Sequence, residues 1–249
     1  MRVKTSWKYL ITTITILSAL AVGLLAFYHN DVFFIRHIEI VIENTNDVDP
    51  KLVKLWTQKI QQKLVYLSGK ALFSIPVEKI RSDVETEDWI VGCAVRKSFP
   101  DTIVVQIISE KVAAALVGER GLIAPVSEKG KILKVVESSE VPDVPILVGE
   151  GLRKSPVLRQ SAILMFHELP AEGRMGRARI AEIGYEDQHG FWTRTMDQKA
   201  KIFLGREDFS LRAQRVSQVL QYLDQRQIEA RVIDAGLSKK VLVRLRKDP

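Results

Sequence analysis

Cysteine is almost absent from this sequence, with Cys93 as the single example in 249 residues. One thiol cannot form an intramolecular disulfide, so the packing of an apolar core must hold the fold together. The same shortage excludes a metal site built from several cysteines. Because Cys93 lies in the apolar segment Ile90–Val95, a small buried side chain is a better interpretation than a reactive thiol.

Catalytic motifs are missing as well. His167-Glu168 is not followed by a second histidine at helical spacing, so the motif of zinc proteases is absent. Neither a Gly-x-Ser-x-Gly nucleophile turn nor a phosphate-binding glycine loop occurs. We therefore predict a non-enzymatic protein without catalytic residues, metal site, cofactor or small-molecule substrate. A carboxylate pair has no sequence signature, so an anchored enzyme of unknown motif stays open as an alternative.

Charge of one sign is not concentrated in the folded part of the chain. The net charge is +7, and Arg2, Lys4 and Lys8 precede the first apolar run. The small remaining excess fits ordinary solubilising charge or a mildly basic surface near anionic lipid, and no nucleic acid partner is predicted. With 46% hydrophobic and 27% charged residues, most of the chain should be globular.

The N-terminal region does contain a long uncharged run. No charged residue occurs between Tyr9 and Phe27, and roughly 20 helical residues cross the hydrocarbon core of a bilayer. We predict a cytoplasmic segment over residues 1–8 and a single transmembrane helix over residues 9–28. The predicted anchor side chains are Leu10, Ile14, Leu17, Leu20, Leu24 and Phe27.

Flanking charges predict the orientation of this helix. Basic residues precede the run, so the positive-inside rule places the N-terminus in the cytoplasm and residues 30–249 outside. The alternative is a cleaved signal peptide, because Ala19-Leu20-Ala21 has the small-x-small shape of a cleavage site. The apolar run continues beyond this site, which favours an uncleaved anchor. Both interpretations export the rest of the chain.

Residues 33–110 predict a small domain with the order strand, helix, helix, strand, strand. Its first strand has isoleucines at period two, and its first helix begins at Asp49-Pro50 and ends at Gly69. A second helix begins near Pro76. The last two strands, 90–97 and 102–109, are joined by turn residues and should form an antiparallel hairpin. We expect the helices to cover one face of a three-stranded sheet.

Residues 111–249 predict a second α+β domain with an antiparallel sheet. The expected elements, in chain order, are short strands in 112–133, an extended connection over 141–149, a helix over 155–169, three strands within 180–204, an amphipathic helix over 210–226, and final strands over 230–234 and 240–245. The chain is thus of the α+β class, with one transmembrane helix before two exported domains.

These features resemble the FtsQ/DivIB family of cell-division proteins. The element order directly after an anchor looks like a POTRA domain. Within Asp88–Ile103, the residues are similar to the family's Trp-Val pair, Ala-x-Val-x-Arg strand and Pro-x-Thr turn. Trp192 and Leu204-Gly205-Arg206 also match the family's pattern. The chain departs from the pattern at Asn44, at Glu110–Ala113 and at Asp234-Ala235-Gly236, where the family's Asp-Leu-Arg arginine is missing.

The resemblance implies a bitopic scaffold of the bacterial divisome, located in the inner membrane at the septum and linking early and late division proteins. It also implies that the C-terminal region engages partners resembling FtsB and FtsL. The partner site predicted in this way comprises Ile233, Asp234, Leu237, Val241, Leu242, Val243, Arg244 and Leu245.

The residues themselves favour a strand edge at this site. Val241, Val243 and Leu245 should point to one face, and a strand near the C-terminus often lies at a sheet edge that can accept a partner strand. The basic residues around it equally fit a blunted edge that prevents aggregation. Another POTRA-bearing assembly or secretion factor is the alternative function.

Overall fold

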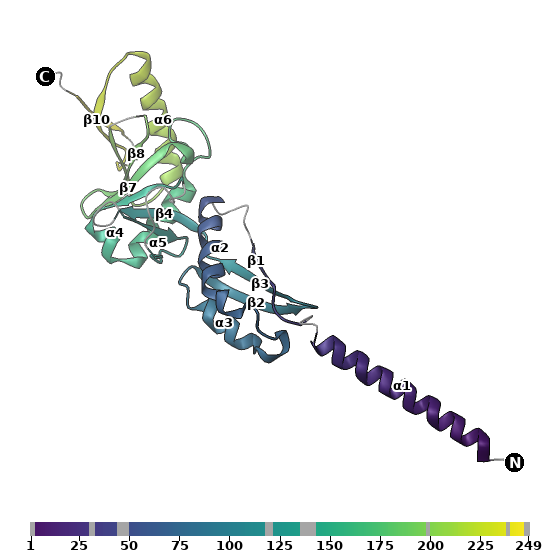
Figure 1. Cartoon of the computed structure of the whole chain (residues 1–249). Helices are drawn as coiled ribbons and strands as arrows, with labels where there is room; N and C mark the ends of the chain where they lie inside the picture. Colours follow the sequence, from purple (N-terminus) through teal and green to yellow (C-terminus); the bar gives the residue numbers. More distant parts are fainter. Residues whose placement is uncertain are drawn as a thin grey trace. The chain divides into compact units, whose positions relative to one another are not determined.

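The computed structural model of this chain describes residues 3–29, 33–43, 50–117, 122–134, 143–197, 200–237 and 240–246, and it describes side chains of the N-terminal helix from residue 9 to residue 23. The chain divides into two compact units. The first comprises Met1–Glu43 and Trp56–Ser109, and the second comprises Asn44–Leu55 and Glu110–Pro249. Figure 1 shows their elements in the colours of the sequence.

The predicted N-terminal helix is present as α1, Val3–His29 (Figure 1), and it begins earlier than residue 9. Its hydroxyl groups bond within the helix: Thr13 donates to the Tyr9 carbonyl at 2.7 Å and Thr15 to the Ile11 carbonyl at 2.6 Å. Among the described residues, no helix combines the length and the apolar character needed to cross a bilayer. The membrane crossing therefore stays a prediction.

Four of the predicted anchor side chains are described, and all four are exposed. These are Leu10, Ile14, Leu17 and Leu20. The side chains of Leu24 and Phe27 lie outside the described part of the helix.

The first unit has the predicted order of elements. In chain order they are β1 (His37–Glu43), α2 (Pro50–Leu64), whose residues 50–55 belong to the second unit, the 3-10 turns η2 (Val65–Leu67) and η3 (Leu72–Ser74), α3 (Val77–Glu85), β2 (Ile90–Ser98) and β3 (Thr102–Ser109). Gly69, at φ 73°, follows η2 as expected for the end of this helical region. The predicted N-cap Asp49 lies outside the described residues.

The sheet of this unit has the order β1-β3-β2, and its alternation explains the core. The β2–β3 hairpin is antiparallel as predicted, whereas β1 runs parallel to β3. Ile38 pairs with Ile103 and Ile42 with Ile107, so these isoleucines lie on one face of the sheet, and all but the half-buried Ile38 belong to the buried core. Trp56 from α2 and Trp89 stack in this core, with ring centroids 4.4 Å apart and planes 5° apart.

The second unit contains helices and strands in the order expected, with two additions. Its elements are β4 (Val112–Val117), β5 (Ile123–Ser127), β6 (Ile146–Val148), α4 (Glu150–Lys154), α5 (Pro156–Glu168), the 3-10 turn η6 (Arg177–Arg179), β7 (Ile180–Glu186), β8 (Gly190–Thr195), β9 (Lys201–Gly205), α6 (Phe209–Gln225), β10 (Ala230–Asp234) and β11 (Leu242–Leu245). The predicted connection over 141–149 supplies β6, and α4 was not predicted.

The prediction of an antiparallel sheet is wrong, because the sheet is mixed. In the described residues its order is β11-β10-β9-β8-β7-β6-β4-β5. The pairs β4–β6, β6–β7 and β9–β10 are parallel. For β6–β7 and β9–β10 the physical reason is the connections: α4 and α5 lie between β6 and β7, and α6 lies between β9 and β10. A crossover helix returns the chain to start the next strand in the same direction.

One row of side chains crosses six strands on the face that the helices cover. In register it runs through Leu147, Ile183, Thr193, Ile202, Ile233 and Val243. All but Val243 are buried. Residues of α5 and α6, such as Ile163 and Val216, join the same core.

The edge of the sheet formed by β5 is sealed. Pro125 has no N–H group to offer, and its carbonyl accepts a hydrogen bond from the Leu133 N–H at 2.8 Å. The Ser127 N–H donates to the Lys131 carbonyl at 2.9 Å, and Val126 forms a bridge with Ile132. A proline and a folded-back segment thus protect this edge.

Candidate partner-binding edge

The opposite edge of the same sheet is β11. This strand pairs antiparallel with β10, with Ile233 opposite Val243 and Asp234 opposite Leu242. In the part of the chain that the structure describes, no strand lies on its outer side. The expectation that the final strand lies at a sheet edge is therefore confirmed.

Backbone hydrogen bonding shows which groups of β11 face outward. The Arg246 N–H donates to the Glu229 carbonyl at 2.9 Å, so Arg246 directs its backbone toward β10. Successive residues of an antiparallel strand direct their backbone groups alternately to the two sides. The Arg244 backbone accordingly faces β10, and the N–H and C=O groups of Val243 and Leu245 face the open side.

The turn after β10 is fixed by a side chain at the predicted site. The Asp234 carboxylate accepts a hydrogen bond from the Gly236 N–H at 2.9 Å, an arrangement that lets aspartate cap a turn. The Ala235 N–H donates to the Phe203 carbonyl at 2.9 Å, so β10 continues to bond with β9 to its end. These bonds end β10 at Asp234, as predicted. The family's missing arginine is replaced by Gly236, which is half-buried here.

The structure brings the predicted site residues together at one corner of the sheet, but they differ in exposure. Ile233 is 0% exposed, so it can serve a partner only by holding β11 in place. Leu242 and Leu245 are 53% and 54% exposed. The other members are Asp234, Val241 and Val243, which are half-buried, and Leu237 and Arg244, which are exposed.

An apolar groove between α6 and β11 adds residues that the sequence interpretation missed. Val243 and Leu245 form its β11 side, and the other lining residues are Gln218, Val219, Tyr222, Leu223 and Ile228. The ring of Tyr222 lies 4.6 Å from the Arg226 guanidinium one turn later. This i, i+4 spacing of an aromatic and an arginine was the available sequence signal.

The edge is basic. Lys240 and Arg244 are exposed, and Arg246 forms an ion pair with Glu229 at 3.2 Å. An acidic partner segment would meet complementary charge here, which raises the rate and the specificity of association.

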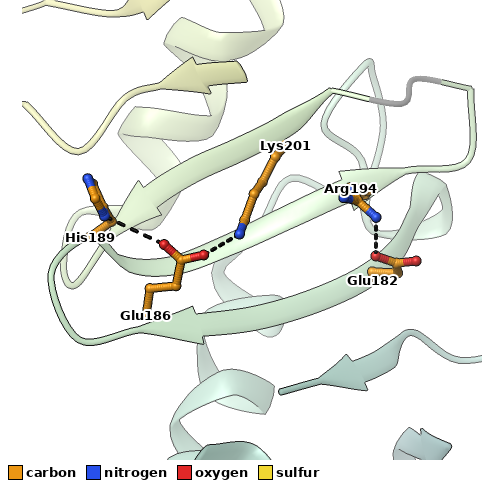
Figure 2. A network of polar contacts seen from close by, with 5 residues as sticks. All are labelled: Glu182, Glu186, His189, Arg194 and Lys201. Carbon is orange, nitrogen blue, oxygen red and sulfur yellow. Dashed lines mark hydrogen bonds and ion pairs between the residues drawn. The ribbon is translucent and has the colours of Figure 1, made fainter. Parts of the chain in front are cut away.

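The opposite face of the sheet carries a polar network that ties together the strands supporting this edge. Figure 2 shows Arg194 on β8 paired with Glu182 on β7 at 3.0 Å. It also shows Lys201 on β9 bonded to Glu186, whose other oxygen lies 3.6 Å from His189 Nδ1. Each contact joins residues of different strands or of the β7–β8 turn, so the network holds β7, β8 and β9 in register.

Trp192 lies beneath this network, and its indole occupies space that is open only because the residue opposite it, Gly184, has no side chain. The Lys201 ammonium lies 4.2 Å from the centre of a Trp192 ring. Gly184 pairs with Trp192 across the strands, and a Cβ at Gly184 would come within 2.2 Å of the indole. The ion pairs of Figure 2 therefore tie three strands together, and one of their members, Lys201, covers a ring of Trp192. Within the described ranges, no group of three or more potential metal ligands occurs.

Comparison with known proteins agrees with this architecture. Residues 47–108 match the family model described as "POTRA domain, FtsQ-type", and residues 115–235 match "Cell division protein FtsQ/DivIB, C-terminal". The chain is also 21% identical over 184 residues to "Cell division protein FtsQ" of Syntrophotalea carbinolica. This similarity covers 71% of the present chain and 64% of the relative, so the chain spans less than two thirds of the relative's length.

The two matched models, an FtsQ-type POTRA domain and an FtsQ/DivIB C-terminal domain, describe adjacent parts of one class of division protein. The chain belongs to the FtsQ/DivIB family of cell-division proteins. The resemblance noted in the sequence is thereby confirmed. The FtsQ type of the POTRA match also favours a division protein over other POTRA-bearing assembly or secretion factors.

Proposed function

We propose that this protein is a non-enzymatic, bitopic scaffold of the bacterial divisome. It links early and late division proteins at the septum through protein–protein contacts of its exported domains. The observation that carries the proposal is the open, basic β11 edge in a chain that matches both family models. The proposed organisation is an anchor over residues 9–28, a POTRA domain over 33–110 and a C-terminal domain over 111–249.

The proposed anchor is α1, with the N-terminus in the cytoplasm and the domains outside. The uncharged run between Tyr9 and Phe27 supports it, as do the basic residues that precede the run. The hydroxyl groups within α1 bond to carbonyls of the preceding turn, which is how a helix in lipid satisfies its polar side chains. An anchor raises the effective concentration of partners that are themselves held in the membrane.

The proposed partner contact is strand addition at β11 by division proteins resembling FtsB and FtsL. A partner strand would bond to the outward backbone groups of Val243 and Leu245, while its side chains reach the groove beside α6. Backbone bonds give affinity in this mode and side-chain contacts give specificity. The cations on and beside β11 favour an acidic partner segment.

Replacing Val243 by proline tests the contact. Val243→Pro removes one outward N–H donor but no inward bond to β10, and proline is tolerated in edge strands. We expect about tenfold weaker binding of the full chain to its FtsB-like and FtsL-like partners, because one lost hydrogen bond and an unpaired acceptor together cost roughly 1–2 kcal/mol. Co-purification followed by titration in detergent measures the loss.

Val243→Thr is the matched control, since it keeps both the backbone donor and the β-branched shape. Hydrogen exchange of β10 amides should be unchanged in both variants, which establishes that the domain stays folded. A fluorescent fusion to the C-terminus should form a midcell band with Val243→Thr and a weaker one with Val243→Pro. Unchanged partner affinity in Val243→Pro would sink the strand-addition proposal.

A further inference from the structure

Three phenylalanines, of which Phe73 and Phe99 are exposed and Phe33 is half-buried, form a cluster at one end of the POTRA domain. Phe33 and Phe73 have ring centroids 5.3 Å apart, Phe73 and Phe99 are 5.4 Å apart, and Phe33 and Phe99 are 6.5 Å apart. Phe73 is 60% exposed and Phe99 is 61% exposed. Phenylalanine is usually buried, and adjacent exposed aromatic side chains indicate a contact surface.

The cluster is built by three segments that are far apart in the sequence. Phe33 precedes β1, Phe73 lies in η3, and Phe99 lies in the β2–β3 turn. The Leu72 N–H donates to the Phe33 carbonyl at 2.7 Å, which fixes the first segment to η3. The Arg36 N–H donates to the Asp101 carbonyl at 3.0 Å, which fixes it to the turn. The surface is therefore held by the backbone of the domain.

The length of chain between α1 and this cluster limits what can cover it. Helix α1 ends at His29, and Phe33 follows four residues later. Four residues span at most roughly 14 Å even when fully extended. If α1 is held in a bilayer, Phe33 cannot move away from the membrane interface by more than about this distance. Lipid is thus the surface that always lies within reach of the cluster.

Charges around the cluster suit anionic headgroups. Arg36 and Lys70 are exposed, and the Ile35 N–H donates to the Lys70 carbonyl at 2.9 Å, which places the two cations in adjoining segments. The nearby acidic residue Asp101 is half-buried and accepts a hydrogen bond from the Thr102 hydroxyl at 3.0 Å. Aromatic side chains beside basic ones are the pattern of protein surfaces that lie in the headgroup layer.

We propose that Phe33, Phe73 and Phe99 form a membrane-contact surface that seats the POTRA domain on the outer face of the bilayer holding α1. The proposal rests on the anchor in the proposed function. Seating would restrict the swing of the exported domains about the short connection after α1. Membrane contact would thus be the role of the end of the POTRA domain that contains the β2–β3 turn.

Depth-dependent fluorescence quenching tests this surface in the full chain. The protein carries Phe73→Trp in a Trp7→Phe background and is reconstituted into vesicles of phosphatidylethanolamine and phosphatidylglycerol with acyl-chain-brominated lipid. The fluorescence of the three remaining native tryptophans is measured in the Trp7→Phe parent protein and subtracted. The matched control is Val91→Trp in the same background. Val91 is 54% exposed and lies at the far end of β2, roughly 25 Å along the strand from Phe99.

We expect bromolipid to quench the indole introduced at position 73 at least twofold and to leave that at position 91 unquenched. Equal quenching at both positions, or none at either in vesicle-bound protein, would overturn the proposed surface while the anchor stands. Flotation of the vesicles after alkaline washing reports the anchor separately. Loss of the protein from floated vesicles would overturn the anchor, and the seating proposal with it.

Discussion

Adding one methyl group at Gly184 should destabilise the C-terminal domain through Trp192. A Cβ built on Gly184 lies 2.2 Å from both Cε2 and Cζ2 of the indole. These atoms belong to the middle of a rigid ring system that is only 6% exposed and is covered by Lys201. The side chain cannot yield as a flexible terminus would, so either β7 must shift or the indole must leave its slot.

The expected loss in the free energy of unfolding is set by whichever of these two responses costs less free energy. Expelling the indole would expose roughly 150–250 Å², which at about 25 cal/mol per Å² costs roughly 4–6 kcal/mol. Overpacking absorbed by backbone shifts costs roughly 1–3 kcal/mol. Alanine also lowers the conformational entropy of the unfolded chain, which stabilises the folded state by roughly 0.5 kcal/mol. Gly184→Ala should therefore lower the free energy of unfolding by about 2 kcal/mol.

Calorimetry of the full chain measures this change in the transition of the C-terminal domain, which should fall by roughly 5–8 °C. Gly92→Ala is the control, because a Cβ at that strand position meets only the Ile108 Cδ1 atom at 3.7 Å. Its transition should be unchanged or slightly higher. A Gly184→Ala protein as stable as the parent would refute the packing argument. Partial recovery in Gly184→Ala with Trp192→Leu would confirm that the indole carries the cost.

Two further predictions concern buried groups. Burial raises the pKa of the Cys93 thiol to about 11, so thiol labelling of the folded chain should be slow at neutral pH, and a labelling rate equal to that in urea would contradict this. The contribution of this thiol to the free energy of unfolding is complete below about pH 9 and is lost as the pH rises toward 11. Arg159, whose pKa is lowered by burial, donates to the carbonyls of Gly130, Leu152 and Arg153 at 2.6–3.0 Å. Arg159→Met should cost roughly 2–4 kcal/mol in urea unfolding by leaving these acceptors unpaired, whereas the exposed Arg153→Met should stay within about 0.5 kcal/mol.

The POTRA fold was predictable because its signals are local. Period-two isoleucines fixed the face of β1, and Phe99-Pro100-Asp101 fixed the hairpin turn, so β3 matches its predicted range of 102–109. The C-terminal sheet was harder, since strand direction depends on whether a crossover helix or a tight turn joins two strands, and on which strands become neighbours. The three residues of β6 gave no period to detect, and adjacent prolines suggested a linker instead. No local pattern predicts α4, because its N-cap is Gly149 and its second residue is Gly151, and glycine is a poor helix former.

The candidate site was predicted only in part for the same reason. The range of β10 was correct, and that of β11 was two residues too long at its start. Alternation placed Val243 and Leu245 on one face, which the groove beside α6 confirms. The complete burial of Ile233 follows from its place between β9 and β11, which no single segment reveals. Likewise, Tyr222 becomes part of the groove only when β11 returns beside α6.

The unequal edges of the C-terminal sheet limit how many chains it can join. If both edges were open, the β11 edge of one copy could pair with the β5 edge of the next, and such head-to-tail pairing propagates into fibres. Pro125 and the folded-back segment through Leu133 close the β5 edge to such pairing. Head-to-tail growth therefore stops after a single strand addition. Even at high local concentration, these proteins remain discrete complexes, each with one open edge strand, β11.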